Sequence, residues 1–241
     1  MTNTILEHVL ATLKQDYPVS QIEVSAHWTM VTSRSSGLAS TITGCGPHGE
    51  QLVHQAGELL ERSALELAAL CLSENTLEAA IGLAAVNSLI ETPLQNRRVI
   101  NVADVLAERG SGKCIAMIGH FPFIPKLRGI AKEIWVIDLQ PAEGEFSPAQ
   151  AAQILPKADV LAMTGNTLIN KAAEDYLAMC RPDALKIMMG PSTPMTPVLF
   201  EHGLDILAGV QVVDPTLVHR YISQGAAFSQ VRGIEKITLS A

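Results

Sequence analysis

Four short apolar runs in the second half of the chain each end abruptly at a glycine, an acid or a small polar residue. The runs occupy residues 114–118, 134–137, 160–163 and 185–189. Continuous apolar runs of this length are typical of strands that are buried on both faces, as in a parallel sheet. In such sheets the ligand crevice lies just beyond the carboxyl ends of the strands. The pattern therefore predicts a fold class and the edge of the sheet where a ligand would bind.

Helical and extended patterns alternate around these runs. We expect helices near residues 102–109, 122–129, 148–155, 168–180, 195–202 and 214–223. We expect strands near residues 114–118, 133–138, 159–163, 185–189, 206–210 and 234–239. This alternation implies right-handed crossovers, and hence an α/β fold with a doubly wound, mainly parallel sheet.

The first half of the chain has a different pattern. A helix is expected over residues 3–15, and three segments with period-two alternation follow near residues 22–25, 27–32 and 38–43. Such segments predict a small antiparallel meander. A further helix, from about residue 76 to 89, is apolar nearly all round, and a helix without a polar face is buried. The first half is therefore expected to form a small α+β unit.

The segment Thr-Pro-Leu-Gln-Asn-Arg-Arg at residues 92–98 marks the expected domain boundary. With 241 residues, the chain is long enough for one large domain or two small ones. We expect an α+β domain over residues 1–92 and a Rossmann-like domain over residues 93–241.

Composition and charge exclude several classes of function. The net charge is −7 and no basic stripe is present, so neither nucleic acid nor an anionic membrane is an expected partner. No segment reaches the roughly 18 uninterrupted apolar residues that a membrane helix needs, and no signal peptide is recognised. The four cysteines form no C-x-x-C pair, which is typical of a reduced, cytoplasmic protein. The apolar-rich sequence is compatible with a homodimer, although no heptad or edge-strand pattern indicates one.

The loop after the first run combines a glycine with a histidine. Gly119 would let the backbone approach a ligand, and His120 is the candidate general acid or base, since an unperturbed histidine pKa of about 6.5 lies close to neutrality. Asp138 follows Gly119 by about 20 residues, the spacing of acids that hold ribose hydroxyls in nucleotide-binding sheets. The fingerprint G-x-G-x-x-G is absent, because Phe121 and Ile124 occupy its other glycine positions. Phe121 remains a candidate ligand contact, and a packing turn and a turn acid are the alternatives.

The loops after the third and fourth runs carry small polar side chains. The candidate ligand contacts there are Thr164, Asn166, Thr167, Pro191, Ser192 and Thr193. Asn166 or Thr167 could equally cap the following helix. The stiff, hydroxyl-bearing loop around Ser192 suits an oxyanion or a carboxylate, whereas a nucleophilic serine would lack an adjacent activating base.

The first domain is expected to contribute Asn87 and Gly37 to the same ligand site. Asn87 interrupts the apolar helix, and a buried amide needs hydrogen-bond partners. The Asn87 side chain either ties the helix to a neighbouring backbone or projects into the cleft between the domains.

A cluster of possible metal ligands lies between the expected meander and the expected apolar helix of the first half. Cys45, His48, Glu50 and His54 fall within a short segment, and Cys45-x-x-His48 has the spacing of a ligand pair. The sequence shows no second pair that would complete a four-coordinate zinc site. Cys45, His48 and His54 are therefore candidates for metal contact.

Several of these segments together resemble a family of uncharacterised prokaryotic proteins known as putative heavy-metal chelation proteins. The matching segments are residues 81–87, 119–123, 164–170, 189–194, 200–203 and 208–210. The resemblance implies an N-terminal domain like the amino-terminal domain of enolase, a C-terminal Rossmann-like domain and a site where the two meet. The loop from Cys45 to His54 is not part of the matching pattern.

The resulting hypothesis is a protein that binds a small anionic or nucleotide-like ligand in the interdomain cleft. The resemblance suggests a heavy-metal chelator or its precursor as that ligand. Two alternatives remain open: an enzyme of chelator biosynthesis, either methyltransferase-like or condensing/hydrolytic, and a metal-binding or delivery protein. The only cofactors that the sequence suggests are a metal ion and a nucleotide-like small molecule.

Overall fold

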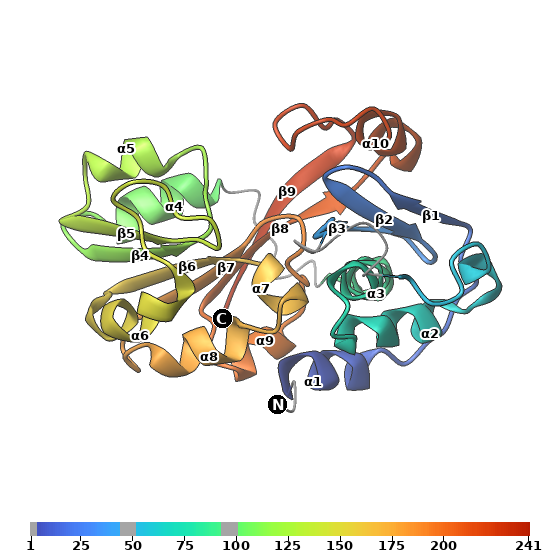
Figure 1. Ribbon diagram of the computed structural model, residues 1–241, viewed down its shortest axis with the longest axis horizontal. Coiled ribbons are helices and arrows are strands. Elements are labelled where there is room, and N and C mark those ends of the chain that lie inside the picture. Colours follow the sequence, from blue (N-terminus) through green and yellow to red (C-terminus); the bar gives the residue numbers. More distant parts are fainter. Residues whose placement is uncertain (1–3, 44–51, 93–100) are drawn as a thin grey trace.

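The first half of the chain forms a small antiparallel sheet. The structure is a computed structural model that describes residues 4–43, 52–92 and 101–241 (Figure 1). The sheet has the order β1-β2-β3, with antiparallel pairing throughout. Its strands are β1 (Gln21–Val24), β2 (Trp28–Thr32) and β3 (Ser36–Ser40). The meander predicted from the alternating segments is therefore confirmed.

One buried helix covers this sheet. The helical elements of the first half are α1 (Thr4–Thr12), α2 (Ala64–Ala68) and α3 (Thr76–Leu89), with 3-10 turns η1 (Leu59–Glu61) and η2 (Ala69–Leu72). Asn75 caps α3 by accepting hydrogen bonds from the amides of Leu77 and Glu78. Gly37 of β3 packs directly on α3, where a Cβ would overlap the carbonyl oxygen of Ala84. This close approach explains why β3 carries a glycine in its interior.

The second half forms a six-stranded sheet in the order β5-β4-β6-β7-β8-β9. The strands are β4 (Cys114–Ile118), β5 (Glu133–Ile137), β6 (Val160–Thr164), β7 (Leu185–Met189), β8 (Ile206–Val212) and β9 (Ile234–Ser240). All neighbours are parallel except β8 and β9. The chain runs from β4 to β5 on one side of β4 and then crosses from β5 to β6 on the other side of β4. The switch point of this sheet therefore lies between β4 and β6.

Both faces of the larger sheet are covered, as the doubly wound expectation requires (Figure 1). The helices are α4 (Val102–Arg109), α5 (Ile124–Arg128), α6 (Ala151–Ile154), α7 (Asn166–Ile169), α8 (Ala173–Met179), α9 (Val198–Glu201) and α10 (Pro215–Ile222), with 3-10 turns η3 (Pro148–Gln150) and η4 (Leu155–Lys157). Along β4, Ile115 and Met117 face an apolar cluster that includes α4 and α5, while Ala116 and Ile118 face one that includes α6, α8 and α9. Successive residues of a strand point to opposite faces, so an unbroken apolar run is needed here.

Several of the expected helices are shorter or divided, including the one expected over residues 148–155, which is η3, α6 and η4 in succession. The helix expected over residues 168–180 is two helices, α7 and α8, because Lys171 adopts a left-handed conformation with φ of 61° between them. The helix expected over residues 195–202 begins only at Val198, after Pro194 and Pro197, which have no amide hydrogen to donate.

One apolar cluster spans both halves of the chain and packs against both sheets. Buried residues of α3, such as Ala84, belong to the same cluster as Ile118 of β4 and Leu168 of α7. The Trp28 indole of β2 donates a hydrogen bond of 2.9 Å to the carbonyl oxygen of Ala226, which lies beyond α10. In Figure 1, β3 lies beside β8, and this contact brings the first half of the chain to the carboxyl edge of the larger sheet.

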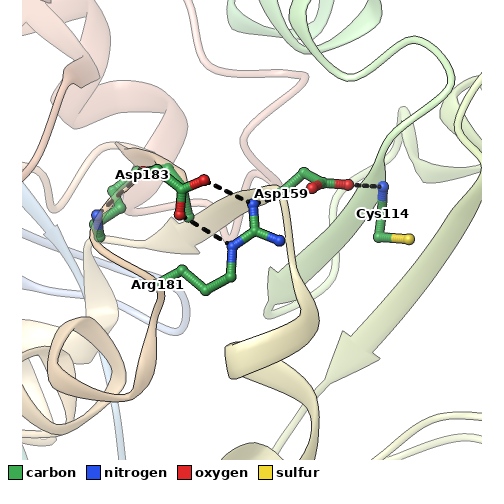
Figure 2. A network of polar contacts seen from close by, with 6 residues as sticks. Cys114, Asp159, Arg181 and Asp183 are labelled. Atoms are coloured by element: carbon green, nitrogen blue, oxygen red, sulfur yellow. Dashed lines mark hydrogen bonds and ion pairs between the residues drawn. The ribbon is translucent and has the colours of Figure 1, made fainter.

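A charged network stabilises the opposite, amino edge of the larger sheet (Figure 2). Asp159, just before β6, accepts a hydrogen bond of 2.8 Å from the Cys114 amide at the start of β4. Arg181 bonds Asp159 at 3.2 Å and Asp183 at 3.1 Å. These residues tie the beginnings of neighbouring strands together and lie away from the strand ends where a ligand is expected. Within the described residues, none of the helices combines the length and the hydropathy that a membrane crossing would require.

Candidate functional site

The carboxyl ends of β4 and β6 border a pocket of about 300 Å³, which we call the switch-point pocket. It lies where an open α/β sheet is expected to hold its ligand. Its lining includes most of the predicted site residues, namely Gly119, His120, Phe121, Asp138, Thr164, Asn166 and Thr167. Ile42 adds a contribution from the first half of the chain. The structure therefore brings the residues of three separate strand-end loops to one place.

His120 is held between two carboxylates. Its Nδ1 lies 3.1 Å from Asp138 Oδ2, and its Nε2 lies 2.7 Å from Glu145 Oε1. A carboxylate only accepts hydrogen bonds, so both contacts require the doubly protonated ring. Partial burial acts to lower the pKa of His120, but the hydrogen bonds to Glu145 and then to Asp138 outweigh it, and the net pKa is raised. Glu145 is therefore a main cause of the raised pKa of His120. The amino-acid sequence shows only that Glu145 shares a loop with Asp138.

Backbone amides orient both carboxylates. Asp138 Oδ1 accepts a hydrogen bond of 2.9 Å from the Gln140 amide, and Glu145 Oε2 accepts one of 2.9 Å from the Ala142 amide. The Asp138 amide in turn donates to the carbonyl oxygen of Phe146 at 3.0 Å. The loop after β5 is thus folded back on itself around His120. Each Asp138 oxygen retains one lone pair with which it could accept a hydrogen bond from a ligand.

A second cavity, of about 470 Å³, lies between the two sheets, and we call it the inter-sheet cleft. The remaining predicted contacts apart from Ser192 lie here, namely Gly37, Asn87, Pro191 and Thr193. The expected single site is therefore two cavities. The physical reason is that the loop after β7 turns toward β3 and α3, whereas the loop after β4 remains at the switch point.

Two buried polar atoms at the inter-sheet cleft have no hydrogen-bond partner within the described residues: Asn87 Oδ1 and Thr193 Oγ1. The other end of the Asn87 amide is satisfied, because Nδ2 donates to the Leu38 carbonyl oxygen at 2.8 Å. Asn87 thus meets both expectations, since it ties α3 to β3 and also presents an acceptor at the cleft. Leaving such an atom unpaired costs about 1–3 kcal/mol, which a bound group would relieve.

Ser192 stands between the two cavities and is only 1% exposed. Its hydroxyl donates to Asn166 Oδ1 at 2.7 Å and accepts from the Ser40 amide at 2.9 Å. Ser192 therefore joins the loops after β6 and β7 to the end of β3. Thr167 is similarly engaged, because its hydroxyl donates to the Thr164 carbonyl oxygen at 2.8 Å. Hydrogen bonds within the protein therefore satisfy the hydroxyls of both Ser192 and Thr167 without a ligand.

Arg34 is the one cationic side chain among the described residues that line the inter-sheet cleft. It pairs with Glu91 at 3.1 Å and donates to the Ile90 carbonyl oxygen at 3.0 Å. Arg34, Ile90 and Glu91 also line an adjoining pocket of about 400 Å³. The ion pair between Arg34 and Glu91 therefore lies between this pocket and the inter-sheet cleft. Sequence reasoning did not identify Arg34. The available signals were its rarity, as one of three basic residues in the first 90, and its position three residues before Gly37.

The predicted metal contacts are not assembled in the described structure. Cys45 and His48 lie outside the described residues, and His54 is exposed, with its amide donating to Glu78 at 2.8 Å. Among residues 4–43, 52–92 and 101–241, no group of three histidine, cysteine or acidic side chains is arranged to hold a metal ion. The carboxylates beside His120 contact opposite ring nitrogens, so these three groups do not converge on one point. Metal contact by Cys45, His48 and His54 stays a prediction.

Comparison with known proteins identifies the family. Two family models, both described as "Putative heavy-metal chelation", match residues 6–90 and residues 101–240. The chain belongs to this family. The resemblance inferred from the strand-end loops is thereby confirmed, and the two matched segments together account for both sheets of the structure.

Two solved structures share the fold of this family member. One is a protein of unknown function from Desulfitobacterium hafniense DCB-2, with a TM-score of 0.87, 24% identity and coverage of 99% of this chain and 98% of that one. The other is a protein of unknown function from Pyrococcus horikoshii, with a TM-score of 0.80, 18% identity and 99% coverage of both chains. At these identities the likeness establishes the fold alone.

A curated relative is an uncharacterized protein of Methanocaldococcus jannaschii, 25% identical over 171 residues. The match spans 68% of this chain and 66% of the archaeal protein, slightly less than two thirds of its length. Family membership thus brings the description of heavy-metal chelation, but neither a reaction nor a ligand.

Proposed function

We propose that this protein binds a small anionic molecule in the inter-sheet cleft, and that the molecule is a metal chelator or the precursor of one. The observation that carries the proposal is the pair of buried, unpartnered atoms, Asn87 Oδ1 and Thr193 Oγ1, that border a cavity of about 470 Å³. Buried polar atoms in native proteins are nearly always paired, so an unpaired couple at a cavity points to a bound group.

The side chains around the cleft define the chemistry of the ligand. Asn87 Oδ1 can only accept, so the ligand must offer an N–H or O–H group to it. The Thr193 hydroxyl can donate or accept. Arg34 carries a positive charge at this cleft and Glu91, its ion-pair partner, a negative one, and the N–H groups that Glu91 and the Ile90 carbonyl leave free on the planar guanidinium suit a carboxylate. A hydroxycarboxylate or an aminocarboxylate satisfies all three groups, and carboxylate oxygens together with hydroxyl or amine donors are also groups that ligate metal ions.

The cleft suits an anion better than the switch-point pocket does. No lysine or arginine is found among the described residues that line the pocket. Helix α5, which follows β4, has five residues, so it offers little helix dipole to a phosphate. The anionic ligand is therefore assigned to the cleft, and a phosphate-bearing nucleotide at the switch point is disfavoured.

Two measurements test this assignment. Native mass spectrometry of gently purified protein should reveal a co-purifying small molecule. Isothermal titration with citrate, a hydroxycarboxylate, should then show binding that weakens about tenfold in Thr193→Val, which corresponds to about 1.4 kcal/mol, and at least as much in Arg34→Met. Arg220→Met, an exposed arginine of α10, is the matched control and should bind as the parent does. Citrate binding that is absent, or unchanged in both cleft variants, would contradict the proposal.

A catalytic role for His120 is the second candidate, because the two carboxylates favour its protonated form. As a general acid, the ring would have to leave one carboxylate before it could donate to a ligand. A binding role is therefore favoured over catalysis. For an enzyme of chelator biosynthesis, we expect His120→Gln to abolish turnover while the protein remains folded.

The metal-delivery alternative rests on residues that lie mainly outside the described structure. Metal stoichiometry measured for the parent and for the double variant Cys45→Ser, His48→Ala separates it from the proposal. A stoichiometry that does not change in the double variant excludes this version.

A further inference from the structure

Tyr176 of α8 places an unused hydroxyl at the switch-point pocket. The residue is 7% exposed and lines the pocket, yet within the described residues its hydroxyl makes no hydrogen bond. The hydroxyl is not among the fully enclosed unpaired atoms of the described residues, so it retains contact with solvent. Asp138 and Tyr176 both line the switch-point pocket. Burial raises the pKa of Tyr176, and Asp175 and then Asp138 raise it further. The phenol therefore remains neutral and can both donate and accept.

The charges at this pocket do not balance. Asp138 and Glu145 carry two negative charges, and the protonated His120 between them carries one positive charge. The described part of the lining contains no lysine or arginine that would supply a second positive charge. Taking an anion into such a partly desolvated site would add to the negative charge, whereas one cation would neutralise it.

The pocket also offers aromatic surface. Phe121 lines it and stacks on Phe123 with ring centroids 5.5 Å apart, and Tyr176 contributes a second ring to the lining. Aromatic faces attract cations through their quadrupoles, by about 0.5–2 kcal/mol according to exposure. A carboxylate, a phenol oxygen and two aromatic rings together form a surface that recognises an ammonium group.

We infer that the switch-point pocket is a second ligand site, distinct from the inter-sheet cleft, and that it binds a small primary amine in its ammonium form. Asp138 accepts from the ammonium with the lone pairs that the backbone and His120 leave free. The Tyr176 oxygen accepts a second N–H, and the aliphatic part of the ligand lies against Phe121. The hydrogen bond from Ser192 to Asn166 separates this amine from the anion of the cleft.

A series of compounds that are matched in carbon chain and differ in charge tests the inference directly. Butylammonium, butanol and butyrate share one carbon chain and differ in charge, and each is small enough for a pocket of about 300 Å³. In amide NMR titrations, butylammonium should give saturable shifts at Gly119 and Gly165, and butanol and butyrate should not. The dissociation constant should rise at least about tenfold in Asp138→Asn and about fivefold in Tyr176→Phe, the loss expected for a charged and a neutral hydrogen-bond partner.

Two variants keep the test decisive. Tyr176→Phe removes only an unpaired hydroxyl, so it should fold even if Asp138→Asn loosens the loop around His120. Asp104→Asn, an exposed acid of α4, is the matched control and should bind butylammonium as the parent does. Saturable shifts with butyrate or inorganic phosphate, or an amine affinity unchanged in both Asp138→Asn and Tyr176→Phe, overturn the inference. Citrate titrated into the same samples reports on the cleft alone, so failure of one site is distinguishable from failure of the other.

Discussion

Ser192 donates a hydrogen bond of 2.7 Å to Asn166 Oδ1, and this contact links the loop that borders the inter-sheet cleft to the loop that borders the switch-point pocket. The same Ser192 oxygen accepts from the Ser40 amide at 2.9 Å, so three chain segments meet at a buried hydroxyl. The contact joins the loops after β6 and β7 to the smaller sheet. It therefore affects both the packing of the two sheets and the shape of each cavity.

Replacing Ser192 by alanine should destabilise the protein without unfolding it. The variant leaves the Ser40 amide and Asn166 Oδ1 unpaired, and each lost buried partner costs about 1–3 kcal/mol. Urea denaturation should show a lower midpoint with an unchanged slope. Ser223→Ala, at an exposed hydroxyl after α10, is the control and should change the unfolding free energy by less than about 0.5 kcal/mol. Equal midpoints for Ser192→Ala and the parent would show that the contact is not stabilising.

The charge of His120 makes stability depend on pH. Its folded-state pKa is raised above the ordinary value of 6.5 by Glu145 and Asp138, against the opposing effect of burial. The contribution to stability is therefore complete below about pH 6.5 and is lost as pH rises through the folded-state pKa. NMR titration of the ring should show the raised pKa directly. Glu145→Gln should lower that pKa and flatten the pH dependence, and a ring that titrates below 6.5 in the parent would refute the two-carboxylate contact.

Gly37 should tolerate no side chain, because of its close contact with α3. A Cβ there would overlap the Ala84 carbonyl oxygen, which belongs to backbone and cannot rotate away. Overpacking of this kind costs about 1–3 kcal/mol or more, so Gly37→Ala should lower the thermal midpoint by several degrees. Gly129→Ala is the matched control, since the nearest atom to its new Cβ would be at an ordinary 3.6 Å. If the two variants melt together, β3 does not lie against α3 as described.

Cys71 should be among the least reactive thiols of the folded protein. Burial raises its pKa to about 12, despite the opposing charge of Lys171, and raises the pKa of Cys180 to about 11. Because the thiolate is the reactive form, only about 1 in 10⁴ Cys71 side chains is reactive at pH 8. Peptide mapping after iodoacetamide treatment should find Cys71 unmodified in the native protein and fully modified in urea. Rapid native modification of Cys71 would mean that η2 opens readily.

The larger sheet was predictable from sequence because its strands are buried on both faces. Each of the four apolar runs coincides with a strand, β4 to β7, within one or two residues. The carboxyl edge of the sheet could be predicted as the ligand side for the same reason, and the loops after β4 and β6 at that edge carry His120 and Asn166. The strand order, and with it the switch point between β4 and β6, came only from the structure. The division of the helix expected over residues 168–180 into α7 and α8 could not be predicted. A left-handed residue such as Lys171, between two helical segments, leaves the apolar period of the sequence intact.

The composition of the site was only partly predictable. Asn87 was recognisable as a polar residue in an apolar helix, and its role depends on the orientation of one amide. Arg34 escaped detection because it belongs to no strand-end motif, and Glu145 could be recognised only as an acid in the Asp138 loop that could take the place of Asp138. Their importance comes from contacts with Glu91 and His120, which lie far from them in the sequence.

The sequence by itself determined the two sheets, the edge of the larger sheet that faces a ligand and most of the side chains near that edge. Apolar periodicity and strand-end polarity are local properties, so they can be recognised residue by residue. Only the tertiary structure decided that those side chains line two separate cavities. That outcome depends on where β3 and α3 meet the loop after β7, and on the single buried hydroxyl of Ser192 between them.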